Sequence, residues 1–208
     1  MIILGLTGSI GMGKSTAAAV LRRLGVPVFD ADRAVHQLLA ASGAAVAVVS
    51  AEFPGTASDA GGIDRSQLAQ RVFTDRAALQ RLEAILHPMV AAEEARFVAR
   101  WRARREPLVV LDIPLLFETG AERRCDYVAV VSAPALVQRQ RVLRRAGMTE
   151  IRLKAILQKQ TPDHEKRRRA DFVVPTGAGR SVSLRRLRAI VRFLRGCAAH
   201  RDRGSSDA

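Results

Sequence analysis

Five short runs of mostly hydrophobic residues recur along the chain, with segments of helical spacing between them. Each run has the length of a buried strand; together they are residues 2–7, 26–29, 108–112, 127–131 and 170–174. Strands that alternate with helices are typical of parallel sheets, because a crossover helix returns the chain to the same edge. The pattern therefore predicts an α/β fold in three layers, with a five-stranded parallel sheet between two layers of helices.

The segment from Ser42 to Arg105 follows a different pattern, with no convincing strand. Its hydrophobic residues return every three or four positions, as on one face of a helix; they include Leu68, Val72, Phe73, Leu79, Leu82, Ile85 and Leu86. We expect a helical insertion over residues 33–105, within a core made of residues 1–32 and 106–196. His87 and Pro88 interrupt the helical pattern, so the proline is expected to end or kink a helix there.

A glycine-rich segment follows the first predicted strand. Residues 8–16 read Gly-Ser-Ile-Gly-Met-Gly-Lys-Ser-Thr and satisfy G-x-x-x-x-G-K-[ST], the phosphate-binding loop of many nucleoside triphosphate enzymes. Glycines let successive backbone N–H groups turn inward around a phosphate, and the helix after them adds its positive end. The expected nucleotide-binding residues are Gly8, Gly11, Met12, Gly13, Lys14, Ser15 and Thr16. Lys14 would contact the β- and γ-phosphates of ATP, and the Ser15 hydroxyl would ligate Mg²⁺.

Acidic residues follow two of the other predicted strands. Asp30 and Asp32 come directly after residues 26–29, at the edge of a parallel sheet where ligands bind. A carboxylate there could take the proton of an attacking hydroxyl or orient Mg²⁺, whereas the alternative for Asp32 is to cap the helix that follows. Asp112 ends the run 108–112 like the acid of a Walker B strand and is a second expected Mg²⁺ ligand. The apolar residues 113–118 after it predict either substrate contact or core packing.

Arginines gather on a predicted helix late in the chain, next to a second predicted helix. Pro134 begins one helix, which carries Arg139, Arg141, Arg144 and Arg145, and residues 149–160 form another beyond Gly147. We expect a mobile lid over about 141–165 that closes arginines over the phosphates, although solvated surface arginines are the alternative. Residues 181–196 predict an amphipathic helix, and residues 197–208 are expected to fray.

The composition leaves the meaning of the charge open. The 208 residues carry a formal net charge of +14, and all but four of the 34 basic residues are arginine. Nucleic acid, a phosphorylated small substrate with ATP, and a solvated arginine surface would each fit this charge. The arginine-rich runs lack the interleaved aromatic residues of many nucleic-acid sites, so we expect no nucleic-acid partner. Oligomeric state does not follow from the sequence.

Cysteine spacing and hydrophobicity indicate the cellular setting. Cys125 and Cys197 stand far apart, without the clustered histidines or C-x-x-C spacing of a zinc site, which predicts reduced thiols. The opening apolar run is too short for a signal peptide or a membrane span. We therefore expect a cytoplasmic protein with no membrane partner.

The amino-acid content and the predicted architecture narrow the class of nucleotide-binding enzyme. The sequence contains no asparagine, which excludes the N-K-x-D segment that GTPases use to recognise guanine. One sheet with a helical insertion and an arginine lid favours a small-molecule kinase over a motor or helicase. A nucleoside or nucleoside-monophosphate kinase and, because of the charge, a nucleic-acid-stimulated ATPase are the alternatives.

Five motifs in order resemble the dephospho-CoA kinase family over residues 1–195. They are T-G-S-I-G-M-G-K-S-T at 7–16, V-F-D-A-D at 28–32, L-H-P at 86–88, I-P-L-L-F-E at 113–118 and Q-x-P-x-x-E-K-x-x-x-A-D at 160–171. The resemblance implies a P-loop kinase that uses ATP to phosphorylate the ribose 3′-hydroxyl of dephospho-coenzyme A, in the last step of coenzyme A synthesis. Dephospho-coenzyme A would be its small-molecule acceptor.

The same resemblance assigns roles to individual residues. Asp32 would be the base or orienter of the acceptor hydroxyl, and Lys14 and Arg141 would stabilise charge on the transferred phosphoryl group. His87 and the pair Leu115 and Leu116 would line the acceptor site, together with Asp30. The sequence departs from the family at two positions: Ile156 replaces a common arginine, and Thr176 stands where many members have an asparagine.

Overall fold

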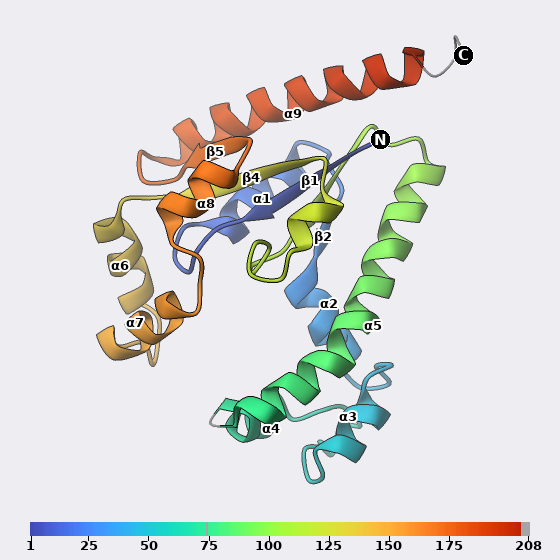
Figure 1. The fold of residues 1–208 in the computed structure, drawn as a ribbon, viewed down its shortest axis with the longest axis vertical. Helices are drawn as coiled ribbons and strands as arrows, with labels where there is room; N and C mark the ends of the chain where they lie inside the picture. The colour runs from blue at the N-terminus through green and yellow to red at the C-terminus, as the bar shows by residue number, and fades with distance from the viewer. Residues whose placement is uncertain (74, 205–208) are drawn as a thin grey trace. The chain divides into compact units, whose positions relative to one another are not determined.

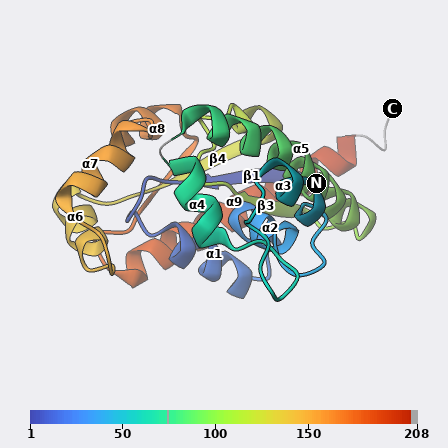
Figure 2. The same cartoon turned by 90° about the horizontal axis from the view of Figure 1, so that it is seen from below.

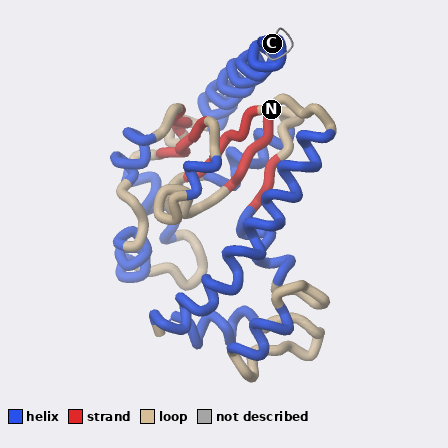
Figure 3. Tube along the Cα trace, turned by 45° about the vertical axis from the view of Figure 1, so that its right-hand side comes forward, coloured by secondary structure: helices blue, strands red, loops and turns tan. Residues whose placement is uncertain are grey.

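The computed structural model describes residues 1–73 and 75–204. The chain divides into two compact units, one made of Met1–Phe29 with the residues from Arg100 onward, and the other made of Asp30–Ala99. Helices and loops make up residues 31–73 and 75–99, whereas the strands gather in the first unit (Figure 3). Each unit has a hydrophobic core of its own.

A five-stranded parallel sheet forms the centre of the first unit, as the sequence predicts (Figure 1). Its strands are β1 (Ile2–Thr7), β2 (Val28–Asp30), β3 (Leu108–Asp112), β4 (Tyr127–Ser132) and β5 (Phe172–Pro175). The order is β2-β3-β1-β4-β5, so β1 is the central strand and pairs in parallel with both β3 and β4. The loop after β1 therefore leaves from the middle of the sheet's carboxyl edge, where α/β sheets bind ligands.

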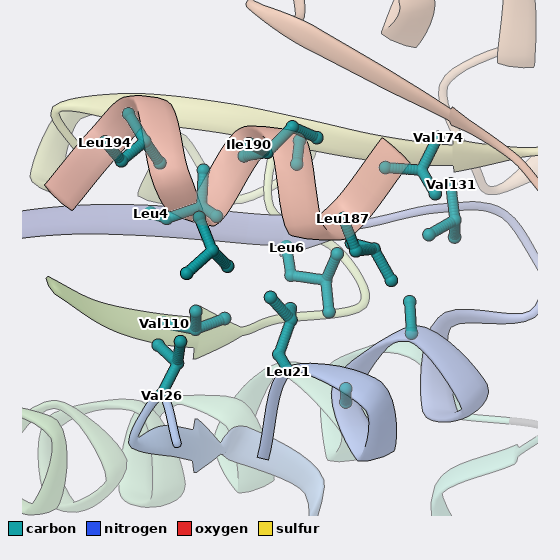
Figure 4. Close-up of a cluster of buried hydrophobic side chains, with 14 of the residues drawn as sticks. Leu4, Leu6, Leu21, Val26, Val110, Val131, Val174, Leu187, Ile190 and Leu194 are labelled. Atoms are coloured by element: carbon teal, nitrogen blue, oxygen red, sulfur yellow. The ribbon is translucent and has the colours of Figure 1, made fainter. Parts of the chain in front are cut away.

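Both faces of the sheet are buried. Alternate residues of β1, β3, β4 and β5 pack with helices α1 (Lys14–Arg23) and α9 (Arg180–Gly204), which contact each other. Figure 4 shows Leu187, Ile190 and Leu194 of α9 beside Leu4 and Leu6 of β1. On the opposite face, a Cβ atom added at Gly5 would lie 2.8 Å from the Cys125 sulfur and 3.1 Å from Leu116. Burial on both faces explains why the strands are almost continuously hydrophobic.

The described residues of the first unit also form four short helices. They are the 3₁₀ turn Ala121–Arg124, α6 (Ala135–Leu143), α7 (Glu150–Gln158) and α8 (Asp163–Arg169). Helices α6 and α7 contact each other and lie side by side in Figure 2, and α8 contacts β4. The Thr149 side chain accepts a hydrogen bond from the Arg152 N–H and so caps α7.

The second unit holds α2 (Ala31–Leu38), α3 (Val46–Glu52), α4 (Arg65–Phe73) and most of α5 (Arg76–Ala103). Its core contains four of the residues whose spacing predicts amphipathic helices, and two more, Leu79 and Ile85, are partly buried against it; the four are Leu68, Val72, Leu82 and Leu86. The side chain of Phe73, another residue of this pattern, lies outside what the structure describes. An isolated antiparallel bridge between Ala57 and Ile63 closes the loop before α4.

Of the two outcomes expected at Pro88, an end or a kink of the helix, the end does not occur, because Pro88 lies inside α5 and the helix runs on to Ala103. The expectation for the last part of the chain is wrong. Residues 197–204, expected to fray, continue α9, and Ala198 is fully buried there, because the packing that holds the rest of α9 extends past Gly196. Residues 205–208 of the expected tail lie outside the described residues.

Candidate active site

The turn from β1 into α1 has a backbone that favours glycine. Gly11 and Gly13 have φ angles of 75° and 93°, in the left-handed region that side chains rarely occupy. Gly8 is needed for a different reason, since a Cβ atom there would lie 2.3 Å from Cγ2 of Val131. The motif glycines therefore allow both the curvature of the loop and its close approach to β4.

The N-terminal end of α1 is free of its own side-chain caps. Gly13 occupies the N-cap position, no side chain there accepts a first-turn N–H, and the first turn holds no acidic residue. The unpaired N–H groups and the positive end of the helix dipole thus favour an anion. Ser15 and Thr16 are exposed at this end, whereas the Met12 side chain is buried and its sulfur accepts a hydrogen bond from the Ala133 N–H at 3.1 Å. Only the main chain of Met12 can face a phosphate.

A lysine and an aspartate meet where the two central strands end. Lys14 Nζ lies 2.7 Å from Asp112 Oδ1, and the Asp112 side chain is 3% exposed. Asp112 ends β3, beside β1, so the sheet register brings the two predicted residues together. This pair places one cation and one anion at the sheet edge beside the phosphate loop.

The donor groups at this edge fit magnesium. A Ser15 hydroxyl and an Asp112 carboxylate are hard oxygen ligands, and Mg²⁺ usually takes one or two protein groups, with phosphates and water completing its shell. Over residues 1–73 and 75–204, no three histidine, cysteine or acidic side chains gather in a way that could hold a metal. The site therefore suits a metal brought with phosphates better than a metal cage built by the protein.

Two glutamines brace the phosphate loop from outside. The Ile10 N–H donates to Gln160 Oε1 at 3.1 Å, and the Ile10 carbonyl accepts from Gln138 Nε2 at 2.8 Å. Gln138 lies on α6, and Gln160 follows α7. Sequence reasoning gave neither glutamine a role. Gln138 lies on an arginine-rich helix and reads as solvated surface, although it is buried, and Gln160 entered only as the first residue of the motif at 160–171.

Arg141 is also fixed beside the phosphate loop. Its Nη2 donates to the Thr176 carbonyl at 2.7 Å and its Nη1 to Thr176 Oγ1 at 3.2 Å, while Thr176 Oγ1 donates to the Met12 carbonyl at 2.6 Å. The other lid candidates lie elsewhere: Arg139 pairs with Glu150 of α7, and Arg144 and Arg145 are exposed. Thr176, at the departure from the family pattern, thus links Arg141 to the loop.

Asp30 and Asp32, at the junction of β2 and α2, have different surroundings. Asp30 Oδ1 accepts a hydrogen bond from the Arg33 N–H at 3.0 Å and occupies the N-cap of α2. Asp32 lies in the first turn of α2 and is exposed. The capping alternative for Asp32 is therefore wrong, because the helix begins two residues earlier than the sequence pattern suggests.

The three expected acceptor residues outside this turn differ in accessibility. His87 is exposed on α5, and Leu115 is 40% exposed in the loop after β3. Leu116 is fully buried and packs in the core against the backbone of Gly5. That the loop of Leu115 and Leu116 lines the acceptor site stays a prediction; of the two leucines, only Leu115 exposes its side chain to solvent.

A buried ion pair joins the loop after β3 to α8. Lys166 is fully buried, and its Nζ lies 2.9 Å from Glu118 Oε1, which also accepts the Thr161 N–H at 2.8 Å. Burial raises the pKa of Glu118, but the Lys166 ammonium and the backbone N–H groups together hold that pKa below its ordinary value. The sequence hid this pair, because Lys166 opens a run of basic residues that reads as a solvated face.

No helix in the described part of the chain is both long enough and apolar enough to cross a membrane.

Comparisons with known proteins identify relatives of this chain. A family model described as dephospho-CoA kinase matches residues 2–180. A dephospho-CoA kinase of Paramagnetospirillum magneticum is 64% identical over 196 residues, which cover 94% of this chain and 92% of that relative. A dephospho-CoA kinase of Mesorhizobium japonicum is 58% identical over 196 residues, or 94% of this chain and 98% of the relative.

Two solved structures share the fold. A crystal structure of a Thermus thermophilus protein matches with a TM-score of 0.77 and 39% identity, covering 93% of this chain and 97% of that one. A dephospho-CoA kinase from Campylobacter jejuni matches with a TM-score of 0.67 over 92% of this chain and 96% of that one. At 22% identity, the second likeness supports the fold alone.

Proposed function

Because the chain belongs to the dephospho-CoA kinase family, we propose that it transfers the γ-phosphoryl group of ATP to the ribose 3′-hydroxyl of dephospho-coenzyme A. The products are coenzyme A and ADP, which makes this the last step of coenzyme A synthesis. The observation that carries the proposal is the phosphate loop with its uncapped α1 terminus and the Lys14–Asp112 pair at the centre of the sheet edge.

The donor half of the site binds the ATP phosphates. Backbone N–H groups of residues 8–16 surround the phosphates, and the positive end of α1 favours their charge. Lys14 places its ammonium on the β- and γ-phosphates, and Ser15 with Asp112 would hold Mg²⁺. Bound magnesium would neutralise charge on the phosphate oxygens, and the protein groups keep the phosphates in line with the acceptor.

Catalysis then rests on position and charge. Phosphoryl transfer needs little covalent chemistry from the protein, since its transition state spreads charge over the equatorial oxygens. Lys14 and Arg141 stabilise that charge, and the contacts of Arg141 with Thr176 support its placement beside the loop. Asp32 takes or orients the proton of the attacking 3′-hydroxyl.

The acceptor half comprises residues 33–105 together with the loop after β3. Asp30, His87 and Leu115 contact dephospho-coenzyme A, and a lid over about 141–165 excludes water when both substrates are bound. The acceptor carries a pyrophosphate and ATP three phosphates, so we attribute much of the +14 charge to these small anions. On this proposal the enzyme works in the cytoplasm, without nucleic acid or a membrane as partner.

A panel of acceptors with γ-labelled ATP tests the proposal. Label should pass to dephospho-coenzyme A, with little transfer to nucleosides or nucleoside monophosphates. Transfer to a nucleoside monophosphate in place of dephospho-coenzyme A would identify the alternative kinase. ATP hydrolysis stimulated by RNA or DNA, with a steep salt dependence, would identify a nucleic-acid-dependent ATPase.

A single substitution tests the proposed base. Asp32→Asn should lower kcat by about 10²–10⁴, the usual contribution of general base catalysis, while ATP affinity stays near normal. Asp59→Asn provides the matched control, because Asp59 is another exposed aspartate of the same unit. Near-normal turnover by the Asp32→Asn enzyme would remove Asp32 from the mechanism.

A further inference from the structure

Residues 160–166, which run from the end of α7 into the first turn of α8, contact three parts of the first unit. Gln160 accepts the Ile10 N–H of the phosphate loop, and Asp163 Oδ2 accepts the Ser132 hydroxyl at the end of β4 at 2.7 Å. Lys166 pairs with Glu118 in the loop after β3. Residues 160–166 therefore tie the phosphate loop, a central strand and the loop 113–118 into one frame.

Lys166 is an unusual residue to find at such a point. Among the described residues it is the largest fully buried side chain. Its Nζ lies 2.9 Å from Oε1 of the Glu118 carboxylate. Buried ion pairs of this kind add little net stability compared with hydrophobic residues of the same volume, since both charges lose their water. Stability alone therefore gives a weak reason for a charged pair here.

The Glu118 end of the pair controls a loop beside the phosphate site. The loop 113–118 follows Asp112 directly. A hydrogen bond of 2.9 Å from the Thr7 hydroxyl to the Pro114 carbonyl holds the first half of this loop. Its second half is held by Glu118, which forms an ion pair with Lys166 and accepts a hydrogen bond from the Thr161 N–H. Between these two fixed points, Leu115 is exposed.

We propose that Lys166 is a positioning residue for the acceptor: through Glu118 it fixes the loop 113–118, and with it Leu115, relative to the phosphate loop. The inference rests on the proposed function, because it takes dephospho-coenzyme A as the molecule that this loop contacts.

The ATP side depends less on this pair. The phosphate loop keeps independent supports, since Gln138 donates to the Ile10 carbonyl and Thr176 to the Met12 carbonyl. Loss of the Lys166–Glu118 pair should therefore change acceptor kinetics more than ATP kinetics. A role in stability alone would lower the melting temperature without this asymmetry.

Kinetics of Lys166→Met, Glu118→Gln and the double variant test the proposal. Misplacing a reacting group by about 1 Å can cost up to 10²-fold, so we expect kcat/KM for dephospho-coenzyme A to fall about 10- to 100-fold. KM for ATP should stay within about twofold. The double variant should be no worse than the poorer single variant, because the two residues act as one unit. Glu106→Gln is the control: Glu106 is also partly buried and faces one arginine, Arg195, but it precedes β3 at the other edge of the sheet.

Hydrogen exchange provides a readout that does not need the substrate. In Lys166→Met and Glu118→Gln, the amides of Thr161, of Ile113 and of residues 115–120 should exchange faster than in the wild type, while Glu106→Gln leaves them unchanged. If Lys166→Met fails to fold, Glu118→Gln decides the question, because it keeps the shape of the side chain and removes its charge.

The outcomes separate the two proposals. Unchanged acceptor kcat/KM in folded Glu118→Gln, or multiplicative losses in the double variant, would overturn the positioning role. If the wild-type enzyme does not use dephospho-coenzyme A, the proposed function fails. Hydrogen exchange then still tests the positioning role, because unchanged exchange of the loop amides in Lys166→Met and Glu118→Gln would overturn it.

Discussion

Replacing Thr176 with valine removes one hydroxyl from the contact between Arg141 and the phosphate loop. Thr176 Oγ1 carries a single proton, and the Met12 carbonyl at 2.6 Å is a nearer acceptor than the Ser132 carbonyl at 3.2 Å. The same oxygen accepts from Arg141 Nη1 at 3.2 Å. Valine keeps the shape of the side chain but loses both hydrogen bonds.

The loss of those two hydrogen bonds sets the expected decrease in the free energy of unfolding. A hydrogen bond to a neutral group contributes about 1 kcal/mol, and the long bond from Arg141 about 0.5–1 kcal/mol, because Nη2 keeps its bond to the Thr176 carbonyl. The sum is about 1.5–2 kcal/mol. For a protein of this size that corresponds to a melting temperature lower by roughly 3–8 °C. The loosened Met12 peptide should also weaken ATP binding by up to about tenfold.

Thermal unfolding and calorimetric ATP titration measure both effects. Thr176→Ser is the matched control, because it retains the hydroxyl and should stay within about 2 °C of the wild type. If the valine and serine variants have the same melting temperature and the same ATP affinity, the Thr176 hydroxyl does not hold the loop.

Three further substitutions or conditions test other parts of the site. Lys14→Ala should lower kcat/KM by about 10²–10³ in a steady-state assay, since an ammonium aimed at the phosphates is lost, while the circular dichroism spectrum stays that of a folded protein; an active variant would contradict the loop assignment. Gly8→Ala should cost about 1–3 kcal/mol in urea unfolding and weaken ATP binding, because the new methyl group would overlap Val131. Gly196→Ala in α9, where a Cβ meets nothing within 4 Å, should be neutral or stabilising. The depressed pKa of Glu118 contributes stability that is present above the ordinary pKa of 4.5 and is lost as the pH falls through the lower folded pKa. Urea unfolding from about pH 6 to about pH 3 should therefore show a smaller acid loss for Glu118→Gln than for the wild type; equal slopes would remove this carboxylate from the acid response.

Local patterns predicted most of the fold of the first unit. Strands buried on both faces are continuously hydrophobic, so β1, β3 and β4 were visible as runs, and the glycines and Lys14 of the phosphate loop were visible as a motif. Local patterns could not predict the order of the strands, because that order depends on pairing between strands far apart in the sequence. The contact between Lys14 and Asp112, which are 98 residues apart, has the same origin.

Tertiary packing decided several points that local signals left open. Pro88 predicts either the end of a helix or a kink; α5 continues past it, with Leu82 and Leu86 packed in the core of the second unit. Leu116 reads like Leu115 in the sequence, yet the missing side chain of Gly5 on a neighbouring strand leaves room for it in the core. The buried Lys166 could not be distinguished from its solvated neighbours, because its partner Glu118 lies 48 residues away in the sequence.

The position of the new phosphate on the product tests the central claim most directly. Purified protein, ATP, Mg²⁺ and dephospho-coenzyme A should give a product whose phosphorus spectrum has a new phosphomonoester resonance coupled to the ribose H3′ proton. A phosphate that appears at any other position, or ATP consumed without this resonance, would contradict the proposed reaction.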